Sequence, residues 1–298
     1  MHLLLVAAAL ARTDIAILVS DTLETYDLPV ARFQQAVDRP VTVFDLQGSR
    51  DRADAIVKQL AADPPPLIYA LGAKAAWIAV NELPNVSAVY GMVTDPGRYG
   101  IGGTQITGVS MDVPAEAVLS QFKLFAPKVQ TIGVLLAASN TSERTSAALD
   151  TGREMGFDMK VVRVTNSRDL RAAFVRMSTE IDALWLVPDS VVVTPESFRY
   201  LRSETLRRKV PMLASTENIV RAGALLCVTP DRDMIGLQAA ELAVRILSGG
   251  ETPGLIPPPE PGAIRVVLNR DTLDAVGLPV DPVMLDFADE VVRETAGR

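Results

Sequence analysis

The sequence is poor in the residues that most enzymes use for catalysis. The chain of 298 residues has one histidine, His2, which lies next to the N-terminal methionine. A Ser-His-Asp triad, a Cys-His pair and a histidine-built zinc site all need a histidine inside the fold. Cys227 is the only cysteine, which excludes intrachain disulfides and CxxC motifs, and its apolar neighbours predict a buried small hydrophobe. These counts argue against most hydrolytic, zinc and thiol chemistry.

Few acidic or glycine-rich patterns remain that could support catalysis. Residues 231–233 spell the DxD metal motif, but they precede a predicted helix, where aspartate is favoured by the helix dipole. Asp95 and Asp189 would serve as a glycosidase pair only at a fixed separation, which sequence does not establish. The glycine-rich segment 99–104 is not GxGxxG and no helix follows it, and the chain has no GxxxxGK[ST] phosphate loop. We therefore expect no catalytic residues, no metal and no cofactor.

The polar residues that could bind a small solute follow predicted strands. Ligands of open parallel sheets bind outside the carboxyl ends of the strands. Our candidate ligand-binding residues are Ser20, Asp21, Tyr26, Gly72, Ala73, Thr94, Asp95, Asn140, Thr141, Ser142, Asp189 and Glu217. Capping is the alternative role, because Ser, Thr, Asn and Asp at such turns stabilise the following helix by ~1 kcal/mol each.

Two of these loops predict a specific contact. Gly72 and Ala73 open a predicted helix, whose free N–H groups could hold a carboxylate. Asp189 follows an apolar strand and stands several residues before the next helix can begin at Pro195. We therefore predict that Asp189 is a poor cap and a good partner for a ligand cation or donor.

The elements that carry these loops follow from hydrophobic periodicity. Short β-rich runs alternate with amphipathic stretches, which is typical of βαβ units around parallel sheets. The first array predicts strands at 15–19, 41–44, 67–71 and 87–92, and helices at 29–37, 50–61 and 73–83. The second array predicts helices at 114–125, 142–155, 169–181 and 195–208, and strands at 131–136, 159–164, 183–187 and 210–213. Two such arrays predict an α/β fold of two doubly wound, Rossmann-like lobes.

The last quarter of the chain predicts a long amphipathic helix and an extended connector. Leu170, Phe174, Met177 and Ile181 form a core stripe in one earlier helix, and Ile235, Ala239, Leu242 and Ile246 repeat the pattern in a helix over 233–247. Gly249 and Gly250 provide the expected glycine stop. The proline-rich stretch 252–262 predicts an extended connector, followed by a strand at 264–268 and two short helices.

The N-terminus and the net charge bear on location and partners. Residues 1–11 are apolar and end in Ala9-Leu10-Ala11, which resembles a secretory signal peptide without a basic n-region. No other run approaches the ~18 apolar residues of a membrane span, and no cysteine follows the cleavage site to carry a lipid. The net charge of −7 is spread along the chain without a basic stripe. We expect a soluble, secreted protein that binds no nucleic acid.

Several short sequence segments, taken in order, resemble those of one protein family. They are Thr94-Asp95-Pro96, Ile106-Thr107-Gly108-Val109-Ser110, Ile132-Gly133-Val134-Leu135, residues 183–189, 220–225 and 235–240, Val267-Leu268-Asn269, and Ala275-Val276-Gly277-Leu278. From about residue 13 to its end, the chain is similar to the ABC-transporter substrate-binding proteins that include tryptophan- and tyrosine-binding periplasmic proteins. These have the type I periplasmic binding fold.

The resemblance implies a protein that captures a small polar solute, an amino acid or a related carboxylate, between two lobes and delivers it to a membrane permease. It also implies that the chain crosses between the two lobes three times, near Gly108, near 229–231 and within the proline-rich connector. We expect an N-terminal lobe of 12–108 plus 231–258, a C-terminal lobe of 109–230 plus 259–298, and a monomer. The alternatives are a sensory module that feeds a receptor or kinase, and a two-lobed enzyme such as a glycosyltransferase.

Overall fold

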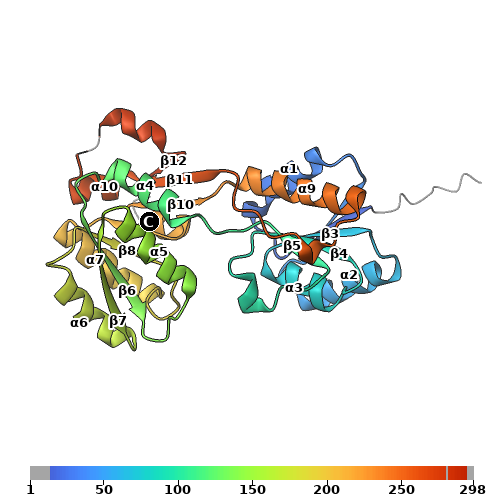
Figure 1. Cartoon of the computed structure of the whole chain (residues 1–298), viewed down its shortest axis with the longest axis horizontal. Coiled ribbons are helices and arrows are strands. Elements are labelled where there is room, and N and C mark those ends of the chain that lie inside the picture. Colours follow the sequence, from blue (N-terminus) through green and yellow to red (C-terminus); the bar gives the residue numbers. More distant parts are fainter. Residues whose placement is uncertain (1–13, 280, 294–298) are drawn as a thin grey trace, which may run out of the picture. The chain divides into compact units, whose positions relative to one another are not determined.

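The computed structural model describes residues 14–279 and 281–293, and the predicted signal-like residues 1–11 lie outside them. The chain forms two compact units. Unit 1 runs to Asp112 and resumes over Pro230–Ala263, and unit 2 consists of Val113–Thr229 and the chain from Ile264 onward. In each unit, helices cover both faces of one open sheet (Figure 1).

The proline-rich connector lies entirely within unit 1, although we expected the chain to leave this lobe at 258. Thr107 Oγ1 donates to the Ile256 carbonyl at 2.7 Å, and Ser110 N donates to the Pro259 carbonyl at 3.0 Å. These hydrogen bonds hold the connector against the unit-1 sheet, so the return to unit 2 comes at Ile264.

The sheet of unit 1 has five strands in the order β2-β1-β3-β4-β5. The strands are β1 (Ile15–Val19), β2 (Val41–Asp45), β3 (Leu67–Leu71), β4 (Ser87–Gly91) and β5 (Ile106–Gly108). All neighbours are parallel. Every residue of β1 and β3 is buried, as expected for central parallel strands covered on both faces. The loops after these strands therefore share one edge.

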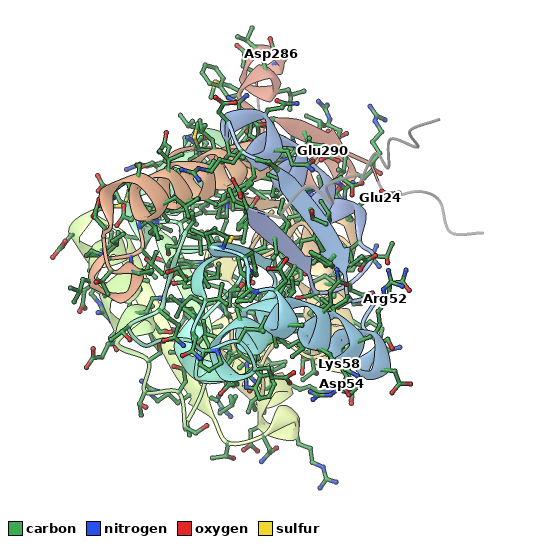
Figure 2. All side chains as sticks on the ribbon, turned by 90° about the vertical axis from the view of Figure 1, so that its right-hand side faces the viewer. Glu24, Arg52, Asp54, Lys58, Asp286 and Glu290 are labelled. Carbon is green, nitrogen blue, oxygen red and sulfur yellow. The ribbon has the colours of Figure 1, made fainter. Side chains whose placement is uncertain are left out.

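Four helices cover this sheet in pairs. The helices α1 (Asp27–Ala36) and α9 (Arg232–Gly249) pack side by side on one face, and α2 (Arg50–Ala62) and α3 (Ala73–Asn81) lie on the other (Figure 1). Charged side chains of α2, among them Arg52, Asp54 and Lys58, project from the ribbon (Figure 2). Short 3₁₀ helices are η1 (Glu24–Tyr26), η2 (Pro96–Tyr99) and η3 (Pro253–Leu255).

The sheet of unit 2 has seven strands in the order β12-β11-β10-β9-β8-β6-β7. They are β6 (Thr131–Ala137), β7 (Asp158–Val164), β8 (Ala183–Trp185), β9 (Met212–Ala214), β10 (Leu226–Pro230), β11 (Ile264–Asn269) and β12 (Glu290–Val292). From β10 to β7 the strands are parallel. In contrast, Asn269 N donates to Leu225 O and Asp231 N donates to Ala263 O, so β11 runs antiparallel to β10.

Helices again cover both faces of this sheet. One core joins it to α4 (Ala115–Phe125), α5 (Glu143–Glu154) and α10 (Arg270–Val276), and a second core joins it to α6 (Ser167–Met177), α7 (Pro195–Arg208) and α8 (Glu217–Arg221). The 3₁₀ helix η4 (Pro282–Phe287) precedes β12.

The predicted long elements agree with the structure to within a few residues, and the short ones differ. The strands β10 and β12 and the helix α8 were not predicted, and α6 ends at Met177 rather than at Ile181. Ile181 still belongs to the core, as do the other residues of both predicted stripes. No helix in the described part of the chain is long and apolar enough to cross a membrane.

Candidate functional site

In unit 1, Ser20 joins the end of β1 to the start of α3. Its hydroxyl donates to the Leu71 carbonyl at 2.8 Å and accepts from Ala75 N at 2.9 Å. Ser20 is buried, and it supplies the N-terminal cap of α3 from a different loop. The predicted residue therefore lies at the carboxyl edge, but its hydroxyl is already engaged by the protein.

Gly72 allows this loop to close tightly. Its φ of +86° is in the region that favours glycine, and a Cβ there would lie 2.5 Å from Tyr26 Oη and 2.6 Å from Ser20 Oγ. The structure thus brings four of the predicted residues, Ser20, Tyr26, Gly72 and Ala73, together at the N-terminus of α3.

Two backbone amides remain open at this helix end. Gly72 N donates to Gly91 O, Ala75 N donates to Ser20, and Ala76 N donates to Gly72 O. Within the described residues, the amides of Ala73 and Lys74 have no acceptor. Unused first-turn amides and the positive end of the helix dipole favour an anion.

The phenol of Tyr26 lies beside these amides. Tyr26 is half-buried, and its hydroxyl makes no hydrogen bond within the part of the chain that the structure describes. Burial raises the pKa of this phenol, and the negative charge of Asp21 raises it further. The group therefore stays protonated at neutral pH and can donate a hydrogen bond to an anion.

The remaining predicted residues of unit 1 are exposed on neighbouring loops. Asp21 receives Thr22 N at 2.8 Å and lies next to Gly48, while Thr94 and Asp95 follow β4. Asp95 has a φ of +53°, so the loop after β4 contains a strained residue of the kind found at binding sites. No described contact joins Thr94 or Asp95 to the α3 end.

In unit 2, Asp189 is tied into the protein, contrary to the prediction that it is a poor cap. Its Oδ1 accepts from Val191 N at 2.9 Å and Val192 N at 3.0 Å. Its Oδ2 accepts from Ala137 N at 2.8 Å and Asn140 Nδ2 at 3.0 Å. Burial acts to raise the pKa of Asp189, but these hydrogen bonds outweigh it and lower the pKa. The carboxylate caps its own loop and joins the ends of β8 and β6.

The other predicted residues after β6 divide between capping and exposure. Asn140 Nδ2 donates to Asp189, and Asn140 Oδ1 accepts from Ser142 N at 3.2 Å. The Ser142 hydroxyl accepts from Thr145 N and caps α5. Thr141 is exposed at the tip of this loop. The structure therefore leaves Thr141 and Ser142 exposed and Asn140 partly buried.

Glu217 begins α8 at the carboxyl edge of the unit-2 sheet. It belongs to a group of four charged side chains, with Arg221, Arg265 and Glu290. Its side chain is 13% exposed and lies 3.9 Å from both Arg221 and Arg265. Glu290 receives both arginines more closely, Arg221 at 2.6 Å and Arg265 by a short contact. Burial acts to raise the pKa of Glu290, and the two arginines more than reverse that effect.

Several site residues were missed by sequence reasoning. The open amide of Lys74 belongs to the helix start that the sequence predicted, but the loop after β2, with its two left-handed residues Gln47 and Gly48, was not predicted. The Gln-Gly pair after an apolar strand was a usable turn signal. Arg265 had no such sequence signal, because it lies near the start of a strand and approaches Glu217 only through the tertiary fold.

In the structure, the two aspartates of the DxD pattern have structural roles. Asp231 caps α9 by accepting from Met234 N at 2.9 Å, and Asp233 pairs with Arg32 at 3.3 Å. No group of three or more His, Cys, Asp or Glu side chains in the described residues could hold a metal ion.

Solved structures with similar folds agree with this architecture. The ABC domain in complex with L-Trp from Streptococcus pneumonia is 21% identical, with a TM-score of 0.62, covering 95% of this chain and 100% of that one. The ligand-free, open structure of a substrate-binding protein with adhesive properties from Clostridium difficile is 23% identical, with a TM-score of 0.77, covering 94% and 99%. The predicted fold, two α/β lobes of the type I periplasmic binding class, is confirmed.

Sequence comparisons agree with the predicted family. A tyrosine-binding protein of Clostridioides difficile (strain R20291) is 26% identical over 240 residues, which cover 78% of this chain and 69% of the relative. The profile of the family described as ABC transporter substrate binding protein matches residues 41–292. This is a family of binding proteins, which argues against the glycosyltransferase alternative. Since the match spans most of the sequence, the chain belongs to the ABC transporter substrate-binding proteins.

Proposed function

We propose that this protein is the solute-binding component of an ABC importer and that its ligand is an aromatic amino acid, tyrosine or tryptophan. The family supports the binding role, and the tyrosine-binding relative and the L-Trp complex support the ligand class. We further propose that it acts in the periplasm as a monomer and delivers its ligand to the membrane permease of the transporter.

The observation that carries the proposal is the open N-terminus of α3. The amides of Ala73 and Lys74 lie at the start of α3, and the hydroxyl of Tyr26 lies beside Gly72 at the same helix end. A carboxylate accepts several such donors at once, and hydrogen bonds to a charged acceptor are the stronger kind. We propose that the α-carboxylate of the amino acid binds here, with Ser20 and Gly72 shaping the loop.

In unit 2, the candidate ligand contacts are Glu217 and Thr141. Glu217 lies at the carboxyl edge of its sheet and suits an α-ammonium group. Thr141 offers an exposed hydroxyl for a further polar contact. Asp189, whose carboxylate is occupied by four protein donors, holds the loops of Asn140 and Val191 in place instead of contacting the ligand.

Calorimetric titration tests the ligand class. L-tyrosine or L-tryptophan should bind, and a ligand at a hundredfold excess over its Kd should stabilise the folded protein by about 2.7 kcal/mol in a melting experiment. L-tyrosinamide, which lacks the carboxylate charge, should bind more weakly. If neither amino acid produces heat or a melting shift, the proposed ligand class is wrong.

The variant Tyr26→Phe tests the carboxylate site. It removes one donor to a charged group, so binding should weaken about 10- to 150-fold while the melting temperature changes little. Tyr200→Phe is the matched control, because the Tyr200 hydroxyl is in unit 2 and reaches only the Arg171 carbonyl, at 3.5 Å. Equal effects of the two variants on affinity would contradict a carboxylate site at α3.

A further inference from the structure

The hydroxyl of Tyr69 is an unpaired polar group inside the core of unit 1. Tyr69 lies in the middle of β3, a central strand, and its side chain is completely buried. Its ring stacks on that of Phe33 in α1, with the two ring centroids 4.4 Å apart. The hydroxyl makes no hydrogen bond to any residue that the structure describes. Phenylalanine would fill the same space without a polar atom, so packing alone does not explain the hydroxyl.

Gly91 shows where this hydroxyl lies. A Cβ on Gly91 would be 2.8 Å from Tyr69 Oη and 3.3 Å from Ile235 Cγ2. The hydroxyl is therefore beside the last residue of β4, at the end of the strand that faces the beginning of α9. Glycine at this strand end leaves the room that the hydroxyl needs.

The backbone directly after Gly91 also has unpaired polar groups. Met92 has a φ of +57°, so the chain turns sharply out of the sheet at the end of β4. The N–H and C=O groups of Met92 and Val93 make no hydrogen bond within the described part of the chain. Val93 is only 1% exposed, so bulk solvent reaches little of it. Buried backbone groups in folded proteins are paired with protein groups or with ordered water.

We propose that an internal water molecule links Tyr69 Oη to the backbone of Met92 and Val93. A buried water makes about three hydrogen bonds to polar groups that lack other partners, and this strand end brings a phenol and unpaired backbone groups together. Burial raises the pKa of Tyr69, so the phenol keeps its proton and donates to the water oxygen. All of these groups are neutral, which suits water rather than an ion.

The water fixes the turn that follows β4. Asp95 is a second left-handed residue in this loop, with a φ of +53°. Such residues persist where the surrounding structure holds them in place. The loop also carries Thr94, but the inference lies wholly within unit 1 and needs no bound ligand. It therefore stands or falls independently of the proposed function.

The variant Tyr69→Phe tests the water through the sign of its effect. It removes the hydroxyl and keeps the ring. If a water joins the hydroxyl to the turn, its loss should lower a melting transition of the protein by about 3–6 °C in scanning calorimetry. A hydroxyl without any partner predicts the opposite sign, because its removal relieves the cost of burying a polar group.

Tyr200→Phe is the matched control. Tyr200 also packs against a phenylalanine, Phe174, but its hydroxyl is in unit 2 and reaches only the Arg171 carbonyl, at 3.5 Å. This variant should leave the transition that responds to Tyr69→Phe in place. An equal fall in both variants would mean that loss of any tyrosine hydroxyl lowers the transition, and the inference would be wrong.

A high-resolution crystal structure of the unaltered protein provides the direct test. It should show a water about 2.5–3.0 Å from Tyr69 Oη that also contacts a backbone atom of Met92 or Val93. A hydroxyl bonded directly to a protein group, or one with no water in that range, overturns the inference, as does a transition that rises in Tyr69→Phe. If Tyr69→Phe does not fold, the structure of the unaltered protein decides the question alone.

Discussion

At the end of β8, Asp189 shows that the position of a residue in the sequence does not fix its hydrogen-bond partners. Its place after an apolar strand and before a long gap suggested a carboxylate free for a ligand. In the structure, the following residues fold back so that Val191 and Val192 donate to it, and the neighbouring strand end supplies Ala137 and Asn140. The position of Asp189 was predictable, but one of its partners, Ala137, comes from a strand 52 residues away in sequence.

The variant Asp189→Asn should lower stability and leave ligand affinity nearly unchanged. We expect a loss of about 1–2 kcal/mol, because the carboxylate is partly exposed and solvent screens its charge. Asp182→Asn is the matched control, since Asp182 accepts from Gln130 N and Thr131 N at the opposite edge of the same sheet. A large affinity loss in Asp189→Asn alone would restore the ligand role.

The same residue predicts a pH dependence. Because the folded protein lowers the pKa of Asp189, its stabilising effect is present above the ordinary aspartate pKa and is lost as pH falls through the folded value. The stability difference between the unaltered protein and Asp189→Asn should therefore shrink in acid. Denaturant titrations at neutral and acidic pH check this, and a difference that grows in acid would contradict it.

Cys227 should resist thiol reagents in the folded state. It is fully buried, and burial raises the pKa of its thiol to about 12, with a further contribution from Glu217. Little thiolate exists at pH 8, and the sulfur is inaccessible. Labelling with a maleimide should thus follow unfolding, and rapid labelling of the native protein would contradict this burial.

At the scale of elements, the loop between β3 and α3 depends on Gly72. Alanine there should cost about 2–3 kcal/mol, because it adds a contact with Ser20 Oγ to the strain of a positive φ. Gly250→Ala is the matched control, since Gly250 has a φ of +63° but no atom within 4 Å of its Cβ position. Chemical denaturation should show a clearly smaller loss for Gly250→Ala, about 1 kcal/mol.

Periodicity predicted the long elements because each buries its own apolar face. The five-residue α8 and the three-residue β12 carry too little pattern for such a signal. Glu290 of β12 meets Arg265 of β11 and Arg221 of α8, so long-range ion pairs contribute to placing these short elements. Contacts of this kind are not readable from local sequence.

For the whole molecule, the sequence predicted the two lobes, and most candidate site residues do lie at the carboxyl edges of the sheets. What it could not assign was their roles. Ser20, Ser142 and Asp189 satisfy backbone amides, whereas the Tyr26 hydroxyl and the amides of Ala73 and Lys74 have no protein partner in the described chain. Both groups look alike in sequence, because the same residue types cap helices and bind ligands.

The two units should also unfold as separate bodies, because each of the four hydrophobic cores draws its residues from one unit. Gly236 of α9 tests this, since a Cβ there would lie 2.5 Å from the Pro29 carbonyl of α1, and backbone cannot easily yield. Gly236→Ala should destabilise unit 1 by about 1–3 kcal/mol despite the better helix propensity of alanine.

Scanning calorimetry of the full chain then distinguishes the units. In Gly236→Ala, one transition should fall by roughly 3 °C for each kcal/mol lost while a second stays in place, because unit 2 keeps its own cores. Gly249→Ala, in the same helix but with only Glu251 near its Cβ position, at 3.9 Å, should leave both transitions unmoved or slightly raised. A single transition that shifts as a whole in Gly236→Ala would mean that the three chain crossings couple the units into one cooperative body.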